Sequence, residues 1–182
     1  MNICFFCSSS ESLNKIYYTI AEEIVFELRK RHWTLVSGGT KLGLMRLLVE
    51  NAAKMGVKSI GVMPSFFADK GILNFQNNKL ILTKDLMERK KKLLEISDAF
   101  VILPGGYGTL DEMFEVLTLK SLNFVNQPVY ILNHNNFYDE LLVFLDKIVA
   151  QNFSRTENEN LFTVFDNVES IFKQLDNLKS KK

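Results

Sequence analysis

Short apolar runs alternate with longer segments of helical periodicity along the whole of the 182-residue chain. The apolar runs predict strands at residues 2–6, 33–37, 58–64, 79–83, 99–104, 128–132 and 161–165. The amphipathic segments predict helices at about 13–31, 43–54, 85–96, 137–150 and 168–178, and one more that ends near 122. Because apolar strands alternate with single helices, the pattern predicts one doubly wound α/β domain over residues 1–182. Its mostly parallel sheet should carry helices on both faces, and the last few residues should fray.

Composition and charge narrow the class of protein further. Apolar residues make up 47% of the chain and charged residues 24%, a balance typical of a globular protein. Lys and Arg number 22 against 21 Asp and Glu, so no overall field favours a nucleic acid, and an anionic ligand must be bound by local groups. No apolar run approaches the roughly 18 residues of a membrane helix, and the N-terminus lacks the basic segment of a signal peptide. We therefore expect a cytoplasmic protein without membrane contact.

The two cysteines and two histidines offer little basis for redox or metal chemistry. Cys4 and Cys7 have C-x-x-C spacing, but both fall on the first predicted strand, where positions three apart face opposite sides of a sheet. A reactive dithiol needs its thiols at the start of a helix. His32 and His134 lack the spacing of metal ligands. We expect neither a metal nor a cofactor.

Two predicted strands end in glycine turns that lead into helices, at residues 38–43 and 104–109. In parallel sheets, ligands bind at the carboxyl ends of the strands. Glycine lets the backbone approach a ligand closely, and a helix start offers free N–H groups to a phosphate. Neither turn has the G-x-G-x-x-G dinucleotide spacing or the G-K-[ST] of a P-loop. The spacing alone leaves two readings open, a phosphate cradle or tight turns with no ligand.

Glu112 follows the second turn and also has two readings. Thr109 and Glu112 have the spacing of a capping box, in which both side chains bind N–H groups of the first helical turn. Asp166 and Glu169 show the same spacing before the last predicted helix, without glycines ahead of them. The glycine-lined hollow in front of Glu112 would instead let its carboxylate face a ligand.

Two cations lie on the apolar side of the helix predicted at 85–96. At about 100° per residue, one arc of this helix contains Leu86, Met87, Leu93, Leu94 and Ile96. Arg89 and Lys90 fall inside that arc. A buried charge costs several kcal/mol unless it is paired. Either the two cations serve a site, or they pair structurally or extend their heads to solvent.

Three segments resemble the LONELY GUY family of cytokinin riboside 5'-monophosphate phosphoribohydrolases. The family's P-G-G-x-G-T-x-x-E is matched by residues 104–112, and its M-x-x-R-K helix by Met87, Arg89 and Lys90. A family segment close to R-G-W-x-L-V-Y-G-G-G-x-x-G-L-M-G is matched by residues 31–46. The resemblance spans residues 1 to about 150 and implies a Rossmann-like, nucleotide-binding fold.

The resemblance also implies a reaction, which is hydrolysis of the bond between a nucleobase and ribose 5'-phosphate. Glu112 would activate water and stabilise the oxocarbenium-like transition state, and Arg89 would orient it. The residues implied to bind the nucleoside monophosphate are Ser8, Gly38, Gly39, Lys90, Gly105, Gly106, Tyr107, Gly108, Thr109 and Asp111. Members are typically homodimers with the site near the interface. The apolar segment 113–122 would suit a dimer surface, although core packing explains it equally well.

Several positions depart from the family pattern. Ser8, Ser37, Thr40 and Arg46 replace the family's Gly, Tyr, Gly and Gly, so the substrate stays open between AMP, a prenylated adenine nucleotide and a pyrimidine nucleotide. Related bacterial proteins are often labelled lysine decarboxylases, but no residue pattern here supports pyridoxal chemistry. The alternative function is a non-catalytic nucleotide or molybdenum-cofactor carrier, which would need the phosphate cradle but not the Arg89–Glu112 pair.

Overall fold

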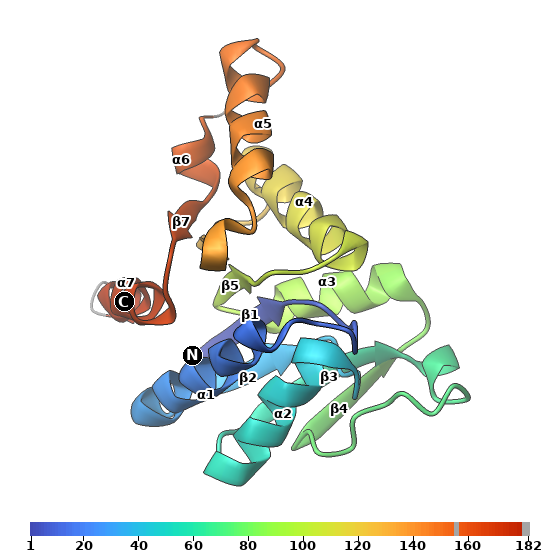
Figure 1. Ribbon diagram of the computed structural model, residues 1–182. Coiled ribbons are helices and arrows are strands. Elements are labelled where there is room, and N and C mark those ends of the chain that lie inside the picture. Colours follow the sequence, from blue (N-terminus) through green and yellow to red (C-terminus); the bar gives the residue numbers. More distant parts are fainter. Residues whose placement is uncertain (155–156, 180–182) are drawn as a thin grey trace.

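The computed structural model describes residues 1–154 and 157–179, in which seven strands form one sheet in the order β4-β3-β2-β1-β5-β6-β7 (Figure 1). Every neighbouring pair of strands is parallel. The strands are β1 Asn2–Phe6, β2 Thr34–Ser37, β3 Ser59–Pro64, β4 Lys79–Thr83, β5 Ala99–Ile102, β6 Val129–Leu132 and β7 Thr163–Phe165. The predicted parallel α/β fold is confirmed.

Helices cover both faces of this sheet. They are α1 Tyr18–Arg31, α2 Gly43–Met55, α3 Leu86–Ile96, α4 Tyr107–Ser121, α5 Asp139–Ala150, α6 Asn158–Leu161 and α7 Val168–Lys179. Short 3-10 turns precede α1 (Lys15–Tyr17), follow β3 (Ser65–Phe67) and precede α5 (His134–Asn136). The first predicted helix therefore begins later than expected, and α6 was not predicted because its single turn is too short to show a period.

Side chains of the central strands alternate between two apolar cores. Ile3 and Phe5 of β1 enter the core beneath α1, α2 and α7, whereas Cys4 and Phe6 enter the core beneath α3, α4 and α5. Cys7 belongs to the first core, so the two thiols face opposite sides of the sheet, as the sequence predicts. Burial raises the pKa of both thiols, which therefore stay protonated at neutral pH.

The order of the strands opens a crevice beside β1. The chain runs outward from β1 through β2 and β3 to β4, then returns to place β5 on the other side of β1. The loops after β1 and β5 consequently leave the sheet on opposite faces, and ligands bind at such a point in this class of fold.

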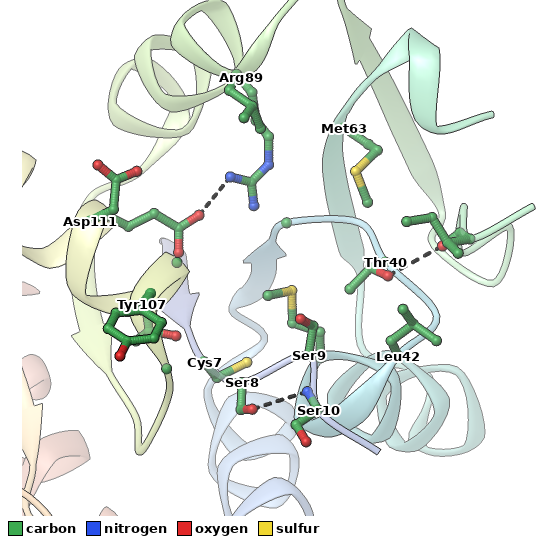
Figure 2. A pocket seen from close by; sticks show the side chains of 18 of the residues that line it. Cys7, Ser8, Ser9, Ser10, Thr40, Leu42, Met63, Arg89, Tyr107 and Asp111 are labelled. Carbon is green, nitrogen blue, oxygen red and sulfur yellow. Dashed lines mark hydrogen bonds and ion pairs between the residues drawn. The ribbon is translucent and has the colours of Figure 1, made fainter. Parts of the chain in front are cut away.

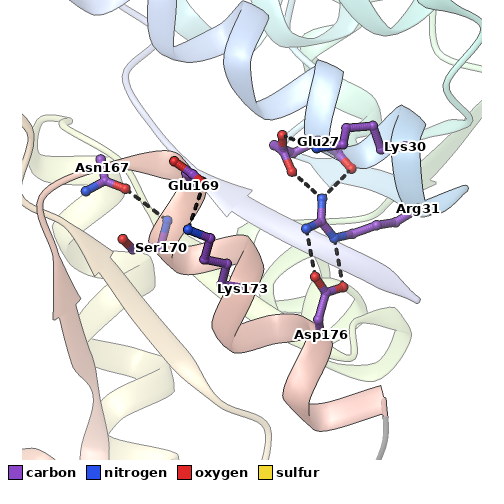
Figure 3. A network of polar contacts seen from close by, with 8 residues as sticks. All are labelled: Glu27, Lys30, Arg31, Asn167, Glu169, Ser170, Lys173 and Asp176. Carbon is purple, nitrogen blue, oxygen red and sulfur yellow. Dashed lines mark hydrogen bonds and ion pairs between the residues drawn. The ribbon is translucent and has the colours of Figure 1, made fainter.

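An arginine anchors α7 to α1, away from that crevice (Figure 3). The Arg31 guanidinium donates to both carboxylate oxygens of Asp176, at 2.8 and 2.7 Å, and also to Glu27 of its own helix. Its carbon Cζ lies 5.2 Å from the ring centre of Phe172, over which it stacks. Bidentate pairing and stacking together make this a specific attachment that a lysine would not reproduce.

Within the described ranges, no helix combines the length and the apolar character needed to cross a membrane.

Candidate active site

A cavity of about 600 Å³ lies where the loops after β1, β2 and β5 meet (Figure 2). Ten of the twelve residues predicted for the site line it, which are Ser8, Gly38, Arg89, Lys90, Gly106, Tyr107, Gly108, Thr109, Asp111 and Glu112. Gly39 and Gly105 belong to the same two turns but are not among the lining residues. The cavity therefore gathers residues that are distant in sequence at the crevice beside β1.

Arg89 and Glu112 form a buried ion pair at the centre of the cavity wall. Nη1 of Arg89 donates to Oε1 of Glu112 at 2.6 Å, and Nε donates to the carbonyl oxygen of Val62 at 3.0 Å. Only 9% of Arg89 and 6% of Glu112 is exposed. The predicted approach of Arg89 and Glu112 is confirmed. Arg89 lies on the side of α3 that faces α4, the helix that carries Glu112.

The rest of that apolar arc is only partly buried. Leu93 is fully buried, but Leu86 is 49% and Met87 78% exposed. The apolar arc of α3 is therefore not buried along its first turn. This turn projects over the rim of the cavity, where Leu86 becomes part of the lining.

Glu112 is not the second half of a capping box. Helix α4 begins at Tyr107 with Gly106 as its N-cap, which makes Thr109 the third helical residue. The capping interpretation is wrong because the chain turns into the helix directly after the glycines. Thr109 packs back on the turn, and a Cβ on Gly105 would lie 2.1 Å from its Oγ1. Glycine at 105 is thus needed to seat the Thr109 side chain.

Burial dominates the electrostatics of Glu112. Removal from water raises the pKa of this carboxyl above its usual 4.5, although the charge and hydrogen bond of Arg89 pull it down. A carboxylate with a raised pKa is a stronger base than an exposed one. This combination suits proton abstraction from water near neutral pH.

Lys90 and Asp111, both predicted to bind substrate, are paired with one another. The Lys90 ammonium lies 3.2 Å from a carboxylate oxygen of Asp111 and 2.5 Å from one of Glu115. Its hydrogen bond to Glu115 raises the pKa of Lys90. Both residues border the cavity, but their charges already serve to join α3 to α4.

The start of α4 opens directly on the cavity. Its N-cap, Gly106, has no side chain to bind the first amides, and the described residues offer no acceptor for those of Tyr107, Gly108 and Thr109. The helix dipole adds partial positive charge there. Three free amides at a helix start can bind a phosphate. The side chain of Tyr107 stands 93% exposed at the rim.

The start of α2 is closed by the protein itself. The amide of Gly43 donates to Oε1 of Glu11 at 2.7 Å, and that of Leu44 donates to the carbonyl of Ser8 at 2.9 Å. The preceding turn is held as well, since Thr40 forms an antiparallel bridge with Leu73. Phosphate binding by the Gly38–Gly39 turn remains a prediction, and the adjoining helix start already has partners.

The opposite wall of the cavity is mostly apolar and was not anticipated. Figure 2 shows Leu42, Thr40 and Met63 facing Asp111 and Tyr107 across the cavity. The apolar lining consists of Leu42, Met45, Met63, Phe67, Ile72 and Leu86. These residues come from four separate segments, so no local sequence pattern marks them.

The departures from the family pattern fall into two groups. Ser8 and Thr40 line the cavity, where the Ser8 hydroxyl accepts from the amide of Ser10 at 3.1 Å. Arg46 is absent from the lining and lies 3.4 Å from both Glu11 and Glu50. Ser37 is buried and is also absent from the lining, so of these four departures Ser8 and Thr40 are the two placed to touch a ligand.

One supporting residue escaped the sequence reasoning altogether. The hydroxyl of Tyr138, at the end of the turn before α5, donates to the carbonyl of Leu103 at 2.8 Å. Its burial raises the pKa of the phenol. This contact braces the backbone just before Gly105. Among the described residues, no group of three or more His, Cys, Asp or Glu side chains could hold a metal ion.

Comparisons with known proteins find close similarity in sequence. A family model described as "Possible lysine decarboxylase" matches residues 45–175. Cytokinin riboside 5'-monophosphate phosphoribohydrolase LOG5 of Arabidopsis thaliana is 34% identical over 177 residues, which are 97% of this chain and 78% of the relative. The probable phosphoribohydrolase LOGL9 of rice (Oryza sativa subsp. japonica) is 37% identical, covering 96% of this chain and 77% of its own.

Solved structures share the fold at lower identity. The Moco carrier protein from Chlamydomonas reinhardtii superposes with a TM-score of 0.73 at 20% identity, covering 100% of this chain and 98% of its own. A molybdenum cofactor binding protein from Rippkaea orientalis gives a TM-score of 0.70 at 21% identity, with 97% and 96% coverage. At this identity the likeness concerns the fold alone.

Proposed function

Since the chain belongs to the LONELY GUY family of phosphoribohydrolases, whose family model carries the lysine decarboxylase description, we propose that it hydrolyses the N-glycosidic bond of a nucleoside 5'-monophosphate. The products are a free base and ribose 5-phosphate. The observation that carries this proposal is the buried pair of Arg89 and Glu112, at 2.6 Å, in the wall of a cavity that also contains the open start of α4.

Glu112 supplies the chemistry in this reaction. As the base leaves, positive charge develops at C1' of the ribose, and a buried carboxylate stabilises it more strongly than an exposed one. The same carboxylate accepts a proton from the attacking water. Arg89 holds Oε1 of Glu112, which restricts the orientation of the carboxylate and leaves Oε2 for the water.

The amides of Tyr107, Gly108 and Thr109 bind the 5'-phosphate. They lie at the start of the helix that carries Glu112, so a phosphate bound there is held at a fixed position relative to the carboxylate. Binding energy from this remote group lowers the barrier at the glycosidic bond. The apolar wall around Met63 and Phe67 then faces the base.

Decarboxylation with a pyridoxal cofactor does not fit the residues present. Of the residues that line the cavity, one is a lysine, Lys90. A Schiff base requires a neutral amine, favoured by a lowered pKa. The carboxylates of Glu115 and Asp111 raise the pKa of Lys90 and keep it charged.

We further propose that this single domain acts in the cytoplasm as a homodimer whose second copy covers the rim of the cavity. Tyr107 and Leu86 line the cavity yet remain largely exposed, and Met87 beside them is exposed too. The segment 113–122 contributes mainly to the core, where Met113, Val116 and Leu117 are buried. Sedimentation velocity tests this proposal, since a monomer at micromolar concentration would contradict it.

A product assay tests the reaction. Purified protein is incubated with a panel of nucleoside 5'-monophosphates and the matching nucleosides, and free base and ribose 5-phosphate are measured. We expect kcat/KM to be at least about a hundredfold higher for the monophosphates, because losing the phosphate contacts costs several kcal/mol in the transition state. Equal values for both classes would contradict the phosphate assignment, and no base release from any member would contradict the reaction.

A further inference from the structure

The guanidinium of Arg89 is enclosed on three sides. Val62 accepts from Nε at 3.0 Å, and Glu112 accepts from Nη1 at 2.6 Å. On the third side the guanidinium faces Gly38, and a Cβ placed on Gly38 would lie 2.2 Å from Nη2 and 3.3 Å from Cζ. Carbon and nitrogen atoms that are not bonded do not approach to 2.2 Å, so Arg89 occupies the space that any other residue at position 38 would fill.

The backbone of Gly38 does not itself require glycine. Positive φ angles occur at Gly39 (76°) and Gly43 (55°) in this segment, whereas Gly38 lies outside the left-handed region. An alanine at this position would therefore not meet the strain that a positive φ imposes. The missing side chain at this position therefore matters for space alone.

We propose that Gly38 is a positioning residue for the reaction, because its missing side chain forms the socket in which the Arg89 guanidinium holds Glu112. The inference rests on the proposed function and changes the role expected for this glycine turn. Gly38 acts on the carboxylate through Arg89 rather than by donating its amide to phosphate. The contact joins the turn after β2 to α3 and, through Glu112, to α4.

A methyl group at position 38 should leave the fold intact and misplace the guanidinium. Arg89 is a long side chain and can move, but it can do so only by giving up its bond to Val62, to Glu112, or to both. A displacement of about 1 Å in a catalytic group costs on the order of a hundredfold in rate. The loss should fall on kcat, because the amides of Tyr107, Gly108 and Thr109 still bind phosphate.

A double-mutant cycle tests the socket. The variants are Gly38→Ala, Arg89→Met and the double variant, and each is measured for kcat, KM and thermal unfolding. Methionine lacks the guanidinium that a methyl group on residue 38 would meet. We expect Gly38→Ala to lower kcat at least about thirtyfold with KM within about threefold of wild type. It should also lower Tm much more in the wild-type background than in the Arg89→Met background, where the added Cβ still meets Sδ of Met45 at 3.0 Å.

The unfolding cycle decides the question even if a variant, or the wild type, shows no turnover. Equal losses of Tm from Gly38→Ala in both backgrounds would overturn the proposal, because the methyl group would then clash with something other than Arg89. A raised KM and weakened binding of ribose 5-phosphate, with kcat unchanged, would also overturn it in favour of direct phosphate binding. An inactive wild type with coupled Tm values would contradict the proposed function and leave the contact between the two residues established.

Discussion

Two glycine turns of similar sequence lead into helices at the same end of the sheet, and the protein uses them differently. The start of α2 is closed by the protein's own groups, since Glu11 and the Ser8 carbonyl accept from the amides of Gly43 and Leu44. The start of α4 has Gly106 as its N-cap and opens on the cavity. The first turn supports the site, and the second is proposed to bind the substrate.

The glycines of the two turns also have different roles. Gly38 makes room for the Arg89 guanidinium, and Gly39 adopts a φ of 76° that other residues rarely adopt. Gly105 makes room for the Thr109 hydroxyl, whereas a Cβ on Gly106 would meet nothing within 4 Å. A glycine-rich turn thus shows only that side chains are missing. Residues from other segments decide whether the space beside a glycine is filled by a side chain of the protein or is left open to a ligand.

The largest effect is expected from Arg89, which faces Gly38 of the first turn and binds Glu112 in the helix that follows the second. Arg89→Met removes the partner of a buried carboxylate, and breaking such a pair costs about 3–5 kcal/mol. We expect kcat to fall about a thousandfold or more. The pKa of Glu112 should rise further, so the remaining activity should require a higher pH. Initial rates between pH 5 and 9 measure both effects.

Arg89→Lys is the matched control for this substitution. Lysine retains the charge but cannot bond Val62 and Glu112 with one planar group. Its activity should lie between those of wild type and Arg89→Met. Wild-type activity in Arg89→Met would contradict the catalytic role proposed for the Arg89–Glu112 pair.

A much smaller effect is expected at the closed helix start. The hydrogen bond from Gly43 lowers the pKa of Glu11 below its usual 4.5, with Arg46 contributing in the same direction. A carboxyl group whose pKa is lowered by folding stabilises the protein above its unfolded pKa, and this contribution is lost as pH falls through the folded value. Glu11→Gln should therefore have a lower Tm than wild type at pH 7, and the difference should disappear as the pH is lowered below 4.5.

The turnover of Glu11→Gln shows whether the start of α2 takes part in the site. Because Glu11 serves α2 and not the cavity, kcat/KM of Glu11→Gln should stay within about twofold of wild type, as for most surface substitutions. Glu11→Ala, which also removes the acceptor for Gly43, should lower Tm further. A large loss of kcat/KM with an unchanged Tm would show that the start of α2 belongs to the site.

Most of the fold could be predicted from the sequence because the physics is local. The inner strands are buried on both faces and read as largely apolar runs. The edge strands β4 and β7 are only partly buried, yet each still shows as a short apolar run. Arg89 could be found in the same way, since a cation at an apolar helical phase is conspicuous against its neighbours. The family resemblance suggested its partner, Glu112, and in the structure Nη1 of Arg89 lies 2.6 Å from Oε1 of Glu112.

The remaining features depend on contacts between distant segments. Whether Thr109 caps α4 depends on where the helix begins, and the glycines allow it to begin three residues earlier, with Gly106 as the N-cap. Closure of α2 depends on Glu11, an ordinary acidic residue 32 positions before Gly43. The apolar wall, from Leu42 to Leu86, is assembled by topology and has no signature of its own.

The central claim is that Glu112 acts as a catalytic carboxylate rather than a structural group. Glu112→Gln retains an oxygen that can accept from Arg89 but removes the negative charge and the proton acceptor. The substitution leaves the buried Arg89 guanidinium without a counter-charge, so we expect Tm at pH 7 to fall. The fall should be smaller than in Arg89→Met, because the hydrogen bond to Arg89 is kept and burial already raises the pKa of Glu112.

The most direct measurement is therefore turnover of the folded Glu112→Gln protein, made together with its affinity for ribose 5-phosphate. We predict that kcat falls about a hundredfold or more, in line with the loss of a general base and of electrostatic stabilisation. Binding of ribose 5-phosphate should stay within about threefold of wild type, because the amides of α4 are untouched. Wild-type turnover in this variant would contradict a catalytic role for Glu112, and the absence of turnover in both proteins with retained binding would favour a carrier.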